Sequence, residues 1–270
     1  MTDEGRRKGP SVEDVLSPNN FVSYIGAATH TLRSRGWAVV VPFVALTTLL
    51  SLGDLAIRLT IEADTAQLGA RLGLLFALPL VGSMLAARTA RMMARSLVGD
   101  PSSFRGAGEA LRTSRSHLLA CGMIATLLTL ILAQVNPLLG LIGPHLVLGP
   151  PILAQVIGLE NTTLIEGWGR VRVLVKGQAL RIFLYVLCAA LALVMFEVII
   201  TGLIFTLVAN AAGGDAGAIA AIPIEAATAG FGLSFMAAFS LVAYFDCRTR
   251  AEDFDVDDLK ELDEPEPEED

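Results

Sequence analysis

The chain has 270 residues, of which 53% are hydrophobic and only 17% are charged, and its formal net charge is −7 at pH 7. With a mean hydropathy of +0.61, it is too apolar for an ordinary soluble domain. The composition therefore predicts an integral membrane protein and gives no reason to expect a nucleic-acid partner. Residues 1–16 are polar and lack a continuous apolar core, so we expect a disordered cytoplasmic segment without a cleavable signal peptide.

Six apolar segments follow along the chain. A transmembrane helix needs about 20 apolar residues to cross a hydrocarbon layer of about 30 Å. The six segments are Trp37–Leu59, Leu72–Ala87, His117–Val135, Leu138–Leu159, Ile182–Ala209 and Ala218–Phe245. The second is short, and the fifth is so long that it must tilt or project from the membrane. We therefore predict an all-α, polytopic membrane domain of six transmembrane helices over residues 17–252.

Lys and Arg are distributed unequally between the two sides of this predicted membrane domain. Of the 20 Lys and Arg residues, all except Arg58 and Arg71 lie in the N-terminal segment, in the second-to-third and fourth-to-fifth connections, or in the C-terminal tail. Cytoplasmic connections of membrane proteins carry such an excess of positive charge. We therefore expect a multi-pass protein of the plasma membrane with both termini in the cytoplasm.

The two longer cytoplasmic connections carry signals for helices of their own. Residues 100–116 begin with an Asp-Pro-Ser-Ser pattern typical of a helix start, and in residues 160–181 Thr162 or Thr163, followed by Glu166, fits a capping box. Each stretch is basic and precedes a pair of apolar segments, so we predict three hairpins linked by cytoplasmic amphipathic helices. Such helices are expected to lie along anionic lipid headgroups. The alternative is that their arginines only enforce the topology.

One carboxylate lies inside a predicted span. Glu197 is near the middle of the fifth span, where a charge costs about 2.5 kcal/mol or more, so it should face the interior of the bundle. There it could form part of a proton or substrate path. The alternative is a neutral carboxylic acid that is hydrogen-bonded to Thr201, Asn210 or Gln134.

The fourth predicted span is irregular. Pro144, Pro150 and Pro151 remove backbone donors within it, so it should be kinked or broken. His145 lies inside this break. Broken helices at membrane depth are found at transport sites, but a single histidine without companions is more consistent with a structural hydrogen bond than with a metal ligand.

Catalytic patterns are missing from the sequence. There is no HExxH helix, no GxSxG elbow and no Walker A loop. The three cysteines do not form a CxxC pair, and a disulfide framework is not expected. We therefore expect no enzyme activity, no cofactor and no bound metal.

Acidic and basic residues alternate where the last predicted span ends. Arg250 is four residues after Asp246, so the two share a helix face and can pair. Arg248 points elsewhere and is placed to reach Glu160 or Glu166 at the fourth-to-fifth connection. These five residues form a candidate interfacial ion-pair cluster that fixes the last helix. The alternative is that the arginines extend to lipid phosphates.

Two stretches resemble a known family of membrane domains. They are LGPPILAQVIGLENTTLIEGWGRVRVLVKG at 148–177 and AYFDCRTRAEDFD at 243–255. They resemble the glycerophosphoryl diester phosphodiesterase membrane-domain family and related uncharacterised six-span prokaryotic proteins. The family ending is matched by Tyr244, Asp246, Arg248, Arg250, Glu252 and Asp255, while Phe245 replaces a usual tyrosine and Asp253 a usual glycine. The resemblance implies a six-span membrane domain and favours the ion-pair cluster; it does not imply diesterase activity, which belongs to a separate soluble domain in the fused proteins.

The C-terminal tail, residues 253–270, contains eleven acidic residues. Such a segment is expected to be disordered and repelled by anionic headgroups, and it either docks a basic partner protein or is only solvated. The sequence as a whole predicts a non-catalytic membrane scaffold or accessory protein that organises partner proteins or lipids. The alternative is a small-solute or ion transporter that uses Glu197 and the broken fourth span.

Overall fold

The computed structural model of the chain describes residues 11–61, 64–99, 104–135, 152–212 and 214–261. These residues form helices and short connections, with no strand among them. The helices are α1 (Val12–Leu16), α2 (Phe21–Arg35), α3 (Trp37–Thr60), α4 (Asp64–Leu97), α5 (Phe104–Ala110), α6 (Arg115–Val135), α8 (Ile152–Glu160), α9 (Leu164–Leu174), α10 (Ala179–Ala212), α11 (Gly214–Glu252) and α12 (Val256–Glu261). The prediction of an all-α chain is therefore confirmed.

Four helices are long and apolar enough to cross a membrane. The candidate spans are Trp37–Thr60 in α3, Arg115–Leu132 in α6, Ala179–Ile204 in α10 and Ile222–Glu252 in α11. They correspond to the first, third, fifth and sixth spans predicted from the sequence. The chain is thus a helical protein embedded in a membrane.

The second and fourth predicted spans have a different outcome. Leu72–Ala87 is only the middle of α4, which has 34 residues and continues in both directions into polar sequence. Of Leu138–Leu159, the structure describes the last part as α8, whose nine residues are too few to cross a bilayer. Residues 136–151, which include His145, lie outside the described residues.

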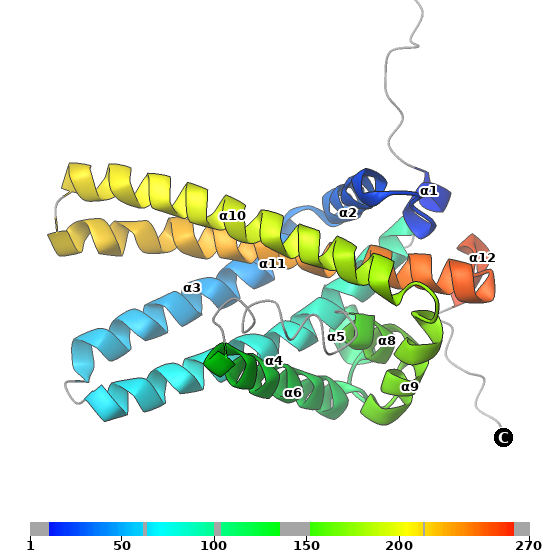
Figure 1. Ribbon diagram of the computed structural model, residues 1–270, viewed down its shortest axis with the longest axis horizontal. Coiled ribbons are helices and arrows are strands. Elements are labelled where there is room, and N and C mark those ends of the chain that lie inside the picture. Colours follow the sequence, from blue (N-terminus) through cyan, green and yellow to red (C-terminus); the bar gives the residue numbers. More distant parts are fainter. Residues whose placement is uncertain (1–10, 62–63, 100–103, 136–151, 213, 262–270) are drawn as a thin grey trace, which may run out of the picture.

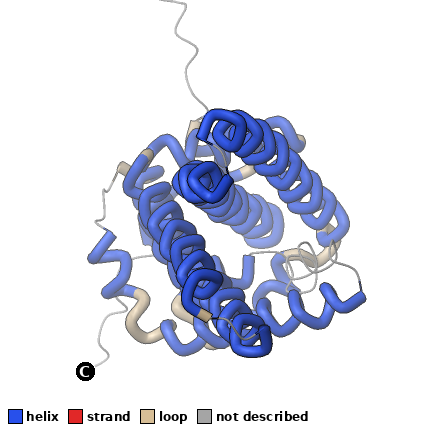
Figure 2. The backbone as a smooth tube through the Cα atoms, turned by 90° about the vertical axis from the view of Figure 1, so that its left-hand side faces the viewer, coloured by secondary structure: helices blue, strands red, loops and turns tan. Residues whose placement is uncertain are grey.

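The long helices form a bundle with α11 at its centre. In Figure 1, α10 runs antiparallel to α11, and α3 runs antiparallel to α4; Figure 2 shows the same helices from one end of the bundle. α11 packs against α10, α3, α2, α4 and α8. In α11, 56% of the candidate span is buried, whereas the corresponding share is 22% in both α3 and α10. The outer helices therefore keep most of their apolar surface for lipid or for other transmembrane helices.

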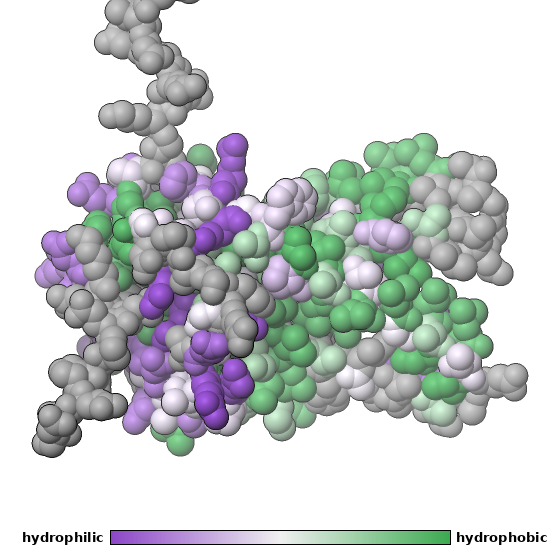
Figure 3. Space-filling view, turned by 180° about the vertical axis from the view of Figure 1, so that it is seen from behind, coloured by the Kyte–Doolittle hydropathy of each residue, from purple (hydrophilic) through white to green (hydrophobic). Residues whose placement is uncertain are grey.

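The surface is divided along the length of the bundle. Hydrophobic residues cover one half of the molecule, and hydrophilic residues gather at the other end (Figure 3). This end, which we call the polar end, consists of α1, α2, α8, α9, α12 and the last part of α11 (Figure 1). The division is what a bilayer requires, because apolar side chains face hydrocarbon in one half and charged side chains face water in the other.

The best-packed core lies at the polar end. Every residue from Ile152 to Leu159 in α8 is buried, and so is the stretch from Ala237 to Cys247 in α11. The largest fully buried side chains include Tyr24, Met93 and Phe239. Burying each large apolar side chain in a water-facing layer contributes about 1.5–3 kcal/mol, so short helices that could not persist alone are held against the ends of α4 and α11.

Two short helices lie within terminal segments whose composition predicts disorder. α1 begins at a capping box formed by Ser11 and Asp14, and its Val15 and Leu16 are buried. In the tail, a hydroxyl–carbonyl hydrogen bond of 3.1 Å from Thr249 to Phe254 fixes the chain after α11, before α12 begins. These polar segments contain few apolar residues, but Val15, Leu16, Phe254 and Leu259 are buried and pack in the core of the polar end.

α3 and α11 approach so closely that a side chain at Gly230 has no room. A Cβ atom added there would lie 2.6 Å from the Cα atom of Val44, which is backbone and cannot rotate away. Nearby, the Thr47 hydroxyl donates to the Ala226 carbonyl at 2.6 Å. Small residues allow such close helix contacts in membranes.

We predict that Gly230→Ala destabilises the protein by about 1–3 kcal/mol because overpacking forces the two backbones apart. Gly232→Ala is the matched control, since nothing lies within 4 Å of a Cβ atom at that position. Thermal unfolding of both variants in detergent measures the difference. Equal melting temperatures for the two variants would contradict the α3–α11 contact.

Candidate functional site: ion pairs at the polar end

The first group of polar residues, which we call the Asp246 site, surrounds one buried carboxylate. Asp246 lies on α11 and its side chain is 0% exposed. Its Oδ1 accepts a hydrogen bond of 2.7 Å from Nε of Arg250. Its Oδ2 accepts from the Tyr24 hydroxyl at 2.5 Å and from Nη2 of Arg181. One carboxylate thus joins α2, α10 and α11.

This arrangement satisfies a group that is costly to bury. Desolvating a carboxylate costs several kcal/mol, and only good geometry with further hydrogen bonds compensates for it. Burial and the negative charge of Asp246 raise the pKa of the Tyr24 phenol well above its usual range. Tyr24 therefore stays protonated and acts as a hydrogen-bond donor to the carboxylate at any physiological pH.

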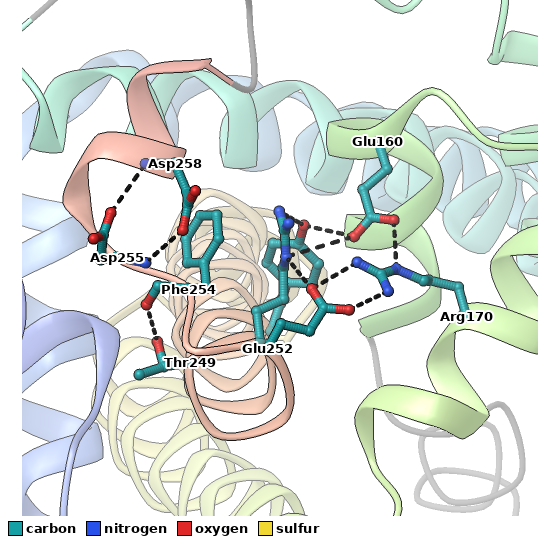
Figure 4. Close-up of polar contacts among 9 residues, drawn as sticks. Glu160, Arg170, Thr249, Glu252, Phe254, Asp255 and Asp258 are labelled. Carbon is teal, nitrogen blue, oxygen red and sulfur yellow. Dashed lines mark hydrogen bonds and ion pairs between the residues drawn. The ribbon is translucent and has the colours of Figure 1, made fainter.

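The second group, which we call the Glu160 site, connects the end of α8 to α9 and α11 (Figure 4). Nε of Arg170 donates to Oε2 of Glu160 at 2.9 Å, and its Nη2 donates to Oε2 of Glu252 at 2.8 Å. The Tyr244 hydroxyl donates to Oε1 of Glu160, also at 2.9 Å. Arg248 completes the group by donating to the Tyr244 hydroxyl and to Glu252, each at 3.1 Å.

Aromatic rings and partial burial strengthen this second group. The guanidinium of Arg248 lies 4.1 Å from the ring centroid of Phe254, a cation–π distance. Burial alone would lower the pKa of Arg170, but hydrogen bonds to Glu252 and Glu160 raise it above its usual value. The guanidinium of Arg170 therefore stays charged and paired with both carboxylates.

A buried arginine of α4 also holds α8 in place. Arg91 is 4% exposed, and its Nε donates to the Gly158 carbonyl at 2.6 Å. Its Nη2 donates to the Leu159 carbonyl at 3.4 Å. The last carbonyls of a helix have no partner within the helix, so Arg91 satisfies groups at the end of α8. In the sequence, Arg91 is only one of several basic residues in a connection, where such residues determine the membrane topology of the chain.

The five residues of the predicted cluster are brought together only in part. The Asp246–Arg250 pair has the expected i, i+4 geometry. Arg248 is 4.0 Å from Glu160, but closer partners of Glu160 are Arg170 and Tyr244. Four of the five predicted residues are therefore divided between two adjacent groups, each of which includes residues of α11.

Glu166 does not join either group, which corrects the expectation from the sequence. It lies in the first turn of α9, where its Oε2 accepts from the Thr163 amide at 3.1 Å and from the Thr163 hydroxyl at 2.8 Å. These hydrogen bonds lower the pKa of Glu166 below its usual value. The sequence predicts a capping box with Thr162 or Thr163, and the structure forms it with Thr163. This box uses Glu166, which the ion-pair prediction also offers as a partner of Arg248.

Sequence reasoning missed the residues that come from a distance. Tyr24 is 222 positions from Asp246, and Arg181 is 65 positions from it, so no local pattern connects them. Arg170 appears in the sequence only as one of several basic residues on an amphipathic helix. A buried acidic residue that needs several donors is the one general signal that could have prompted a search for them.

The predicted intramembrane site is described only for Glu197. This residue is half-buried on α10 and interacts electrostatically with Glu225 on α11. Three partners were suggested for it. The hydroxyl of Thr201 instead lies 3.4 Å from the hydroxyl of Thr228, and Gln134 is exposed on α6. The side chain of Asn210 is outside the described part. His145 also lies outside it.

The chemistry of both sites is that of ion pairing. Among the described residues, no group of three or more His, Cys, Asp or Glu side chains could hold a metal ion. Asp246, Glu160 and Glu252 are each held by arginine, so acid–base chemistry would require breaking these pairs. No family model, no curated protein and no solved structure matches the chain.

We predict that Asp246→Ala lowers the free energy of unfolding by about 3–5 kcal/mol, because it leaves two arginines without their buried counter-charge. The control is Glu166→Gln, which changes an exposed carboxylate outside both sites. Melting temperatures in the same detergent provide the comparison. If the two variants unfold at the same temperature, the Asp246 site does not stabilise the polar end.

We also predict that Glu160 is coupled more strongly to Arg170 than to Arg248. The contact distances are 2.9 Å and 4.0 Å, so a double-mutant cycle with alanine should give about 1–2 kcal/mol for the first pair. The cycle for the second pair should give less. Additive losses for Glu160→Ala and Arg170→Ala would show that no direct pairing occurs.

Proposed function

We propose that the chain is a non-catalytic integral membrane scaffold or accessory protein that organises partner proteins or lipids. The observation that supports this most directly is the fixed polar end. Two ion-pair groups hold α2, α8, α9 and α10 against the end of α11. A surface held in one conformation is suited to recognition, since little conformational entropy is lost when a partner binds.

The proposed topology is six transmembrane helices in three hairpins, in the plasma membrane, with both termini in the cytoplasm. The excess of Lys and Arg in alternate connections supports it. The positions of α1 and α12 agree with it, because both helices lie at the polar end of the molecule (Figure 1). The acidic tail that follows α12 would then be available in the cytoplasm to a basic partner protein.

Membership of the glycerophosphoryl diester phosphodiesterase membrane-domain family is part of this proposal. Its support is that the residues carrying the resemblance have a common structural role. Tyr244, Arg248 and Glu252 belong to the Glu160 site, and Asp246 with Arg250 belongs to the Asp246 site. Asp255 belongs to neither group and instead accepts from the amides of Asp257 and Asp258 at the start of α12. Five of the six matched residues thus take part in the two ion-pair groups that hold the membrane domain together.

A transporter is the second candidate, and one observation favours it. Glu197 is half-buried on α10, in the apolar half of the molecule, and the charge of Glu225 on α11 acts on it. A carboxylate at membrane depth is costly and commonly belongs to an ion or proton pathway. In the described part of the chain, no hydrogen bond or ion pair links Glu197 to another residue.

The two candidates predict different results for matched variants. For the scaffold, a protein or lipid that co-purifies stoichiometrically in mild detergent should be lost in Asp246→Ala and retained in Glu197→Gln. For the transporter, Glu197→Gln should stop pH-driven ion or solute flux in proteoliposomes. Flux that depends on Glu197, without a stoichiometric partner or bound lipid, would overturn the scaffold proposal.

A further inference from the structure

A shallow pocket opens beside the Asp246 site, where the connection after α9 leads into α10. Its volume is about 500 Å³, and it is lined by Gly177, Gln178, Arg181 and Arg250. Two of these four residues are arginines from different helices, and none is acidic. The lining therefore combines positive charge with hydrogen-bond donors.

The carboxylate that holds the two arginines does not cancel their charge. Asp246 contacts both guanidinium groups, but it is buried behind them and does not line the pocket. Two positive charges therefore face one negative charge, and the pocket is left with a net positive potential. Near a protein surface this attraction for an anion is considerably stronger than in bulk water.

The two guanidinium groups also have donors to spare. Each guanidinium carries five N–H donors. Within the described part of the chain, Arg250 donates only through Nε, while Arg181 donates through Nη2 to Asp246 and, at 2.5 Å, to Gln178. Nε of Arg181 is buried and has no acceptor. Because Asp246 already orients both side chains, an anion with several oxygens could be bound at a low entropic cost.

The start of α10, next to the lining residues Gln178 and Arg181, also has backbone donors without a backbone partner in the described part of the chain. The Ile182 amide donates to the Gln178 carbonyl at 3.1 Å, whereas the amides of Ala179, Leu180 and Arg181 have no backbone acceptor in the described segment. The first amides of a helix carry partial positive charge and favour anions. Gly177, with φ of +79°, makes the turn that brings this helix start to the pocket.

The surroundings of the pocket indicate where an anion would come from. Leu180 and Leu184 lie on either side of Arg181 in the α10 sequence, and they are 71% and 44% exposed. No charged residue occurs between Arg181 and Glu197. The pocket therefore lies where α10 passes from the polar end into apolar surroundings, within reach of lipid headgroups.

We propose that this pocket is a binding site for a phosphate group, recognised by Arg181, Arg250 and the start of α10. The chemistry is shared by the phosphate of an anionic lipid headgroup and by a free phosphate ion. Arginine is suited to this task because its planar fork matches phosphate oxygens. The site does not depend on the scaffold function, since a protein of either proposed class could hold a phosphate there.

The test uses the full chain purified in an uncharged detergent. Thermal unfolding is followed while phosphatidylglycerol, phosphatidylcholine or inorganic phosphate is added at constant ionic strength. Gln178→Glu places a negative charge in the pocket but keeps an oxygen that can accept from Arg181. The matched control is Arg172→Gln, which changes the net charge by the same amount at an exposed residue of α9 that does not line the pocket.

Phosphatidylglycerol is expected to stabilise the wild type and Arg172→Gln, with an apparent affinity that falls about tenfold or more in Gln178→Glu. Stabilisation by inorganic phosphate alone, lost in the same variant, would identify a free phosphate site. Arg250→Lys keeps the pair with Asp246 but lacks the fork, so it should weaken binding several-fold. The proposal is overturned if Gln178→Glu and Arg250→Lys both respond like the wild type. It is also overturned if neither phosphatidylglycerol nor inorganic phosphate stabilises the wild type more than the zwitterionic phosphatidylcholine does.

Discussion

The arrangement of the polar end depends on one buried carboxylate. Asp246 is inaccessible to solvent, so its charge must be balanced within the protein. The partners that balance it come from α2, α10 and α11 itself, and together they fix three helices that are far apart in sequence. The Glu160 site, whose α11 residues alternate with Asp246 and Arg250 along the helix, does the same for α8 and α9. The shorter helices therefore pack around the last part of α11.

The two halves of the molecule are stabilised by different forces. In the apolar half, lipid removes most of the hydrophobic drive for helices to associate, so close packing of small residues such as Gly230 matters more. At the polar end, water is present and apolar burial becomes effective, as the buried stretch from Ile152 to Leu159 in α8 shows. The ion pairs lie in this second environment, where partial burial raises their strength and arginine keeps its charge.

Local patterns in the sequence were sufficient for some of these features and not for others. The sequence predicts the all-α class, four of its six expected spans, a capping box that ends at Glu166, and the Asp246–Arg250 pair. Each of these features depends on residues within one segment. The partnership of Tyr24 and Arg181 with Asp246 depends on tertiary packing. Glu166 was assigned two roles, and its local cap took precedence because a bond three residues away costs little chain entropy. α1 and α12 were missed because only a few buried apolar residues distinguish them from disordered segments.

Hydrogen–deuterium exchange of the wild type and Asp246→Asn, each as the full chain in lipid nanodiscs, measures whether Asp246 holds the three helices together. If one carboxylate joins three helices, exchange should accelerate together in α2, in the first turns of α10 and at the end of α11, while α3 remains as protected as before. Faster exchange confined to the residues around position 246, with α2 and α10 unchanged, would contradict the account.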